Sequence, residues 1–133
     1  MNNNTNMAQG WATLAGVVLI AAGLLGFLNT SIIGSAPDAL VRTDNVHNIV
    51  HIVTGLIALY IAFGLKGEQQ ANGVLGFGVL YLIIFVAVLA SPNLFGIFSV
   101  ASNAAVHVIH GALAIVSLAV GYMARNQTSA VAR

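Results

Sequence analysis

Four long apolar segments, separated by short polar ones, dominate the pattern of residues along the chain. They cover residues 11–28, 46–65, 73–90 and 101–124, and none contains Lys, Arg, Asp or Glu. A helix needs about 20 mostly apolar residues to cross a bilayer, and an open strand cannot satisfy its backbone in lipid. The pattern therefore predicts an all-α, integral membrane four-helix bundle, built as a single domain over residues 1–133.

The polar breaks predict where these helices begin and end. Residues 29–44 form the first connection, and Thr43 or Asp44 is placed to cap the second helix. Residues 66–72 predict a short turn, so the second and third helices should form an antiparallel hairpin. Pro92, between Ser91 and Asn93, ends the third helix.

Composition supports lipid as the solvent and excludes several functions. Only 5% of residues are charged and the net charge is +1, whereas a soluble domain carries about 25% charged residues. Nucleic acid is excluded as a partner because it requires clustered Lys and Arg. The chain has no cysteine, which excludes thiolate metal sites. With no carboxylate pair and no phosphate-binding loop, the sequence does not indicate an enzyme.

The few basic residues predict the orientation in the membrane. Lys66, Arg125 and Arg133 fall on one side and Arg42 on the other, so both termini should be cytoplasmic. The first apolar segment is interpreted as a span and not as a secretory signal, because no Lys or Arg precedes it.

The second and fourth segments carry related motifs. His51 corresponds to His107 and Gly55 to Gly111, both at an offset of 56 residues. Each motif places polar residues at positions i, i+4 and i+7, which share one helical face. The two stripes are His47, His51, Thr54 and Asn103, His107, His110. This repeat predicts two parallel αα-hairpins, with His51 and His107 approaching each other near the outer membrane face.

Histidines at these spacings could bind a metal. Neutral imidazole suits Zn and Cu, and Asp44 could add an oxygen ligand or orient an imidazole. The candidate metal ligands are His47, His51, His107, His110 and Asp44. Alternatively, His51 and His107 could be an axial pair for haem, or one of them could hold a chlorophyll-type pigment, with Gly55 and Gly111 leaving room for the macrocycle.

Two other interpretations of the histidines stay open. They could only hydrogen-bond between helices, which fixes helix register, or they could titrate and sense pH. The sequence thus predicts a small membrane accessory or binding protein. The alternatives are a structural or interaction subunit of a larger respiratory or photosynthetic complex, and a small oligomeric transporter. The expected partners are the lipid bilayer and other membrane subunits or further copies of the chain.

The Asn48-x-x-His51-x-x-x-Gly55 element resembles a family of small bacterial membrane proteins of unknown function with four spans. In that family such an element begins the second span, and a related one begins the fourth. His107 and Gly111 fit the second element, although Asn103 lies four residues before His107 instead of three. The resemblance implies the four-span topology and supplies no activity. The expected location is the bacterial inner (cytoplasmic) membrane.

Overall fold

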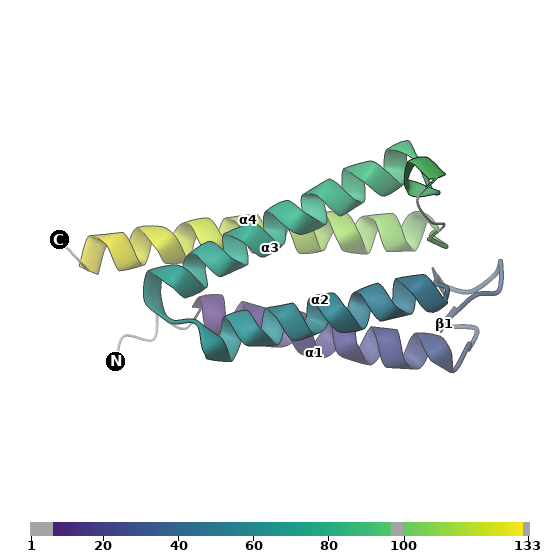
Figure 1. Ribbon diagram of the computed structural model, residues 1–133, viewed down its shortest axis with the longest axis horizontal. Coiled ribbons are helices and arrows are strands. Elements are labelled where there is room, and N and C mark those ends of the chain that lie inside the picture. The colour runs from purple at the N-terminus through teal and green to yellow at the C-terminus, as the bar shows by residue number, and fades with distance from the viewer. Residues whose placement is uncertain (1–6, 97–99, 132–133) are drawn as a thin grey trace.

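The computed structural model describes residues 7–96 and 100–131, most of which lie in four long helices. These helices are α1 (Met7–Phe27), α2 (Asn45–Gly64), α3 (Gly67–Ala90) and α4 (Ala104–Val131). Each is long and apolar enough to cross a membrane, which confirms the all-helical architecture and the four apolar helices. The helices alternate in direction, so the α2–α3 turn and the end of α4 lie at the same end of the molecule (Figure 1).

The four helices form two closely packed pairs. α1 packs along α2 and α3 packs along α4, while the contacts between the pairs are sparser. Glycines allow the close approach within a pair, as small residues do in membrane helix interfaces. A Cβ on Gly55 would lie 2.9 Å from the carbonyl oxygen of Gly16, and one on Gly78 would lie 2.8 Å from the amide nitrogen of Leu118. Each hairpin is therefore a tight unit, and the site forms between them.

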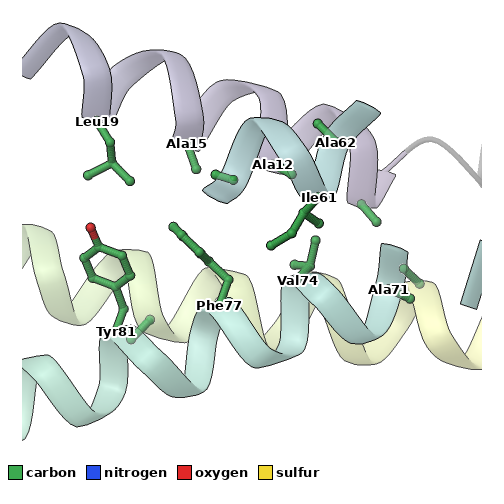
Figure 2. Packing of buried hydrophobic residues seen from close by; sticks show 13 residues of the cluster. Ala12, Ala15, Leu19, Ile61, Ala62, Ala71, Val74, Phe77 and Tyr81 are labelled. Carbon is green, nitrogen blue, oxygen red and sulfur yellow. The ribbon is translucent and has the colours of Figure 1, made fainter. Parts of the chain in front are cut away.

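The space between the pairs is filled by side chains from the inward faces of the helices. Leu19 of α1 and Ile61 of α2 face Val74, Phe77 and Tyr81 of α3 (Figure 2). Polar side chains also join the pairs, since Trp11 of α1 donates a 2.8 Å hydrogen bond to Ser117 of α4.

The connection between α1 and α2 contains short strands that the sequence did not predict. The α1–α2 connection includes two parallel two-residue strands, β1 (Ile33–Gly34) and β2 (Val41–Arg42). A 3-10 turn, η2 (Leu94–Gly96), follows α3. The first connection ends at Asp44, whose side chain accepts a hydrogen bond from the amide of His47. This confirms Asp44 as the cap of α2.

The α2–α3 turn is shorter than the expected residues 66–72. Only Leu65 and Lys66 separate the two helices, and Gly67 turns the chain with φ of +56°, which glycine adopts at little cost. Gln70 then donates to carbonyls at the end of α2, including a 2.8 Å bond to Ala62. The polar residues after Gly67 therefore belong to α3, and Gln70 among them is buried against the end of α2.

Candidate metal centre

Three histidines lie together, buried at the end of the bundle that carries η2. His47 and His51 come from the first two turns of α2, and His110 comes from the second turn of α4. Their side chains are only 2%, 6% and 4% exposed. One ring nitrogen of each lies within 4.8 Å of those of the other two. Three imidazoles from two helices thus converge on one point.

The rings also pack against one another. The centroids of His47 and His51 are 4.3 Å apart, those of His47 and His110 are 5.4 Å apart, and those of His51 and His110 are 5.9 Å apart. Nε2 of His47 lies 3.5 Å from Nε2 of His110. The close packing shows that the trio is a single cluster.

Helix α2 has two buried sides, and this positions its two histidines. On one side Asn48 and Gly55 meet α1. On the other side His47, His51 and Thr54 point towards the centre of the bundle. Polar residues in a membrane helix generally face the interior in this way. The predicted polar stripe of α2 is therefore the face that carries the site.

The orientation of His47 is set by the chain just before α4. Asp44 accepts hydrogen bonds from the amide of His47 at 2.8 Å and from the amide of Ala101 at 2.6 Å. The carbonyl of Ala101 in turn lies 2.9 Å from Nδ1 of His47. A carbonyl can only accept, so Nδ1 carries the proton and Nε2 of the neutral ring presents its lone pair to the cluster. Metal-binding histidines are usually supported in this way.

The other two histidines have less support. Nδ1 of His51 and Nδ1 of His110 are buried and make no hydrogen bond within the part of the chain that the structure describes. An unpaired buried polar atom costs about 1–3 kcal/mol, and in native proteins it often indicates a bound water or ion. The described residues leave Nδ1 of these two rings without a partner, as they do the buried Nδ1 of His107 outside the trio.

A cavity of about 260 Å³ adjoins the trio, between α2, α3 and α4. Tyr81 of α3 also lines it, edge-on to His110 with ring centroids 5.8 Å apart. The hydroxyl of Tyr81 lies 2.6 Å from Oγ1 of Thr54, which itself donates to the carbonyl of Val50 at 2.8 Å. Either hydroxyl can be the donor in that pair, and the bond joins α3 to α2 beside the histidines.

His107 lies outside the trio, although it was expected to face His51. It is half-buried and lines a separate polar hollow of about 620 Å³ that also includes Arg42 and Asp44. The reason is the rotation of α4, which turns Val106 and His110 towards the centre. Asn103, at the start of the expected stripe, precedes α4 and accepts a 3.2 Å hydrogen bond from the amide of Val106.

The two motif glycines pack helices and are not among the residues that line the cavity. Gly55 meets Gly16 and Ile20 of α1, and Gly111 meets Phe85 of α3. Tyr81, by contrast, was not expected at the site. Its signal in the sequence is a lone hydroxyl in the middle of a charge-free apolar segment, because a buried Tyr usually needs a hydrogen-bond partner.

No family model, curated protein or solved structure matches the chain. The resemblance to four-span bacterial membrane proteins stays a prediction, and the function of the site has to be inferred from its geometry. That geometry brings three imidazoles together beside a mainly aliphatic cavity that Tyr81 also lines.

Proposed function

We propose that the protein is an integral membrane protein that binds a transition-metal ion through His47, His51 and His110. The observation that carries this proposal is the convergence of three buried ring nitrogens within 4.8 Å. Imidazole suits Zn and Cu, and three histidines form the ligand set of several zinc sites, where a fourth position is left for another ligand. A cavity adjoins the three rings, and such a ligand would lie there.

The distribution of the basic residues between the two ends of the bundle supports a site at the outer face of the cytoplasmic membrane. Lys66 and Arg125 lie towards the end of the bundle away from the histidines, and Arg42 lies at the histidine end. Under the positive-inside rule the end with Lys66 is cytoplasmic, and both termini are then cytoplasmic. The metal would be exchanged with the outer aqueous side.

The fold also supports an origin from two parallel αα-hairpin repeats. Gly55 of α2 packs against α1, and the matching Gly111 of α4 packs against α3. Each glycine therefore meets the preceding helix of its own hairpin. In this proposal the repeats have diverged at their histidines, since His51 is buried in the trio and His107 is half-buried outside it.

A single ion fits this site better than a haem or a chlorophyll-type pigment. The cavity volume of about 260 Å³ is below the range of about 300–1,000 Å³ that is usual for small-molecule sites. The three imidazole rings also pack on one another, with centroids 4.3–5.9 Å apart, and leave no flat slot between them for a macrocycle.

The proposal is tested by metal analysis of the purified, untagged protein after incubation with Zn²⁺ or Cu²⁺ and removal of free ion. We expect about one ion per chain, retained in His107→Ala and lost in His51→Ala. These variants remove imidazoles at matching positions of the two motifs, so each controls for the other. Failure of the wild-type protein to retain metal, or equal retention in both variants, would overturn the proposal.

A structural role is the second candidate, favoured by the hydrogen bonds that join Asp44, Ala101 and His47. In that case the histidines hold α2 against the start of α4, and the chain serves as a subunit of a larger membrane complex. A metal-free wild-type protein that is destabilised by His47→Ala, and that co-purifies with other membrane proteins in mild detergent, would support it.

A further inference from the structure

The three histidines give a bound ion no negative charge to offset its own. Imidazole binds a metal in its neutral form, and the described residues that line the adjoining cavity include no Asp or Glu. Asp44 and Arg42 carry opposite charges and both line the neighbouring polar hollow. The two oxygens of Asp44 already accept the amides of His47 and Ala101. An ion held by the trio would therefore keep its full charge in a buried position.

Burial of an uncompensated charge favours an ion of low charge. In the Born description, the cost of moving an ion from water into a low-dielectric interior rises with the square of its charge, so it is about four times larger for a divalent than for a monovalent ion. The side chains of the trio are only 2–6% exposed, so water relieves little of this cost. The position of the site therefore disfavours Zn²⁺ and Cu²⁺ relative to a monovalent ion that binds imidazole.

The cavity also limits the number of ligands. It lies where α2 and α3 diverge towards the histidine end (Figure 1), and apart from the trio and Tyr81 it is lined by aliphatic side chains such as Val50 and Val88. A buried water needs about two to four polar partners, and the hydroxyl of Tyr81 already pairs with Thr54 at 2.6 Å. A water in the fourth position of an ion would be poorly held there. The site therefore suits an ion that is stable with three ligands.

Monovalent copper meets both conditions. Cu⁺ carries a single charge, binds imidazole, and has a filled d shell that imposes no fourth ligand. Zn²⁺, by contrast, is almost always four-coordinate in proteins, and Cu²⁺ favours tetragonal sites. The spacing within the trio also fits a shared ion. Nε2 of His47 and Nε2 of His110 are 3.5 Å apart, close to the separation of two nitrogens that bind one ion with bonds of about 2.0 Å.

We infer that the trio binds Cu⁺ in preference to Zn²⁺ and Cu²⁺, with the three imidazoles as the only ligands. The inference rests on the proposed function, because it specifies which ion that site takes. Zn²⁺ and Cu²⁺ still bind, but more weakly than Cu⁺. Ligand type alone would favour Cu²⁺ among the divalent ions, so the preference for Cu⁺ comes from the burial of the site and its apolar wall.

The reduction potential of bound copper tests the inference. Protein in lipid nanodiscs is loaded with an equimolar amount of Cu⁺ under anaerobic conditions and titrated against redox mediators. The potential exceeds that of aqueous copper only if Cu⁺ is bound more tightly than Cu²⁺, and we expect a preference of at least about tenfold. X-ray absorption should show three directly bound nitrogens. A potential at or below that of aqueous copper, or a fourth ligand on Cu⁺, would overturn the inference.

Two variants at Val50 test the role of charge. Val50 is half-buried on α2 and lines the cavity beside the trio. Val50→Asp adds a carboxylate there, and Val50→Asn adds a side chain of the same shape without the charge. We expect at least about tenfold tighter Zn²⁺ binding in Val50→Asp than in Val50→Asn, measured by competition with a chromophoric chelator. Equal affinities would contradict the role of charge. Helical content shows whether the variants are folded, and the potential of the wild-type protein needs no variant.

The outcomes for the metal site and for its preference are separable. A protein that retains neither Cu⁺ nor a divalent ion would refute the proposed function, and this inference with it. A protein that retains an ion would refute this inference alone if equimolar Cu⁺ fails to displace its Zn²⁺, or if its bound copper has a lower potential than aqueous copper.

Discussion

The first turns of α2 and α4 have similar sequences, but they present their histidines differently. In α2 both His47 and His51 are buried, whereas in α4 only His110 is buried and His107 faces a polar hollow. α2 is covered on two sides, by α1 and by the opposite hairpin, while Gly111 of α4 remains partly exposed beside Phe85. The motif therefore determines which residues share one face of a helix. Packing of the helix against its neighbours determines the direction of that face.

The largest expected effect comes from the matched histidines. At a free Zn²⁺ concentration of 100 times Kd, metal binding should stabilise the wild-type protein by about 2.7 kcal/mol. His51→Ala should abolish this increment because it removes a ligand, and His107→Ala should keep it. Unfolding in detergent, with Zn²⁺ and with a chelator, measures the difference. An equal loss in both variants would mean that His107 is also a ligand.

Alanine substitutions at the matched glycines should differ by a smaller amount in their effect on the free energy of unfolding. Gly55→Ala puts a Cβ at 2.9 Å from the carbonyl oxygen of Gly16, and overpacking of this kind costs about 1–3 kcal/mol. At Gly111 the nearest atom, in the ring of Phe85, would be 3.4 Å away, so Gly111→Ala should be neutral or slightly stabilising through helix propensity. Chemical unfolding in mixed micelles measures both variants. Equal destabilisation would show that α3 and α4 pack as tightly there as α1 and α2.

The residues that cap the two helices provide a third comparison. Asp44→Ala and Asn103→Ala should each cost about 1 kcal/mol through loss of an N-cap. Only Asp44→Ala should also weaken Zn²⁺ binding, by about tenfold, because Asp44 holds the Ala101 peptide that orients His47. Competition with a chromophoric zinc chelator measures the affinity. Unchanged affinity in Asp44→Ala would show that His47 does not need this support.

The smallest expected effect is at Tyr81. Tyr81→Phe removes one hydrogen bond, worth about 1 kcal/mol, and leaves Thr54 bonded to the carbonyl of Val50. The helices should therefore stay in place and metal retention should not change. Thermal unfolding and metal analysis of the same sample test this. Loss of metal would make Tyr81 a ligand or an essential support.

Much of the fold could be predicted from the sequence because the apolar segments are long and free of charge. The cap at Asp44 and the shared face of His47 and His51 follow from local helix geometry. The pairing of His51 with His110 does not, because it depends on how α4 is rotated by packing against α3. The cavity depends on the divergence of α2 and α3, and no local pattern in the sequence predicts the angle between two helices.

The peptide group of Ala101 uses both its amide, with Asp44, and its carbonyl, with His47. These contacts involve main-chain atoms, so they place little constraint on the side chain at position 101. Among related chains we therefore expect residue 101 to vary freely while Asp44 and His47 do not. Proline is the exception, because it has no amide hydrogen to donate to Asp44. We therefore expect proline to be absent at position 101, although the other residue types vary there.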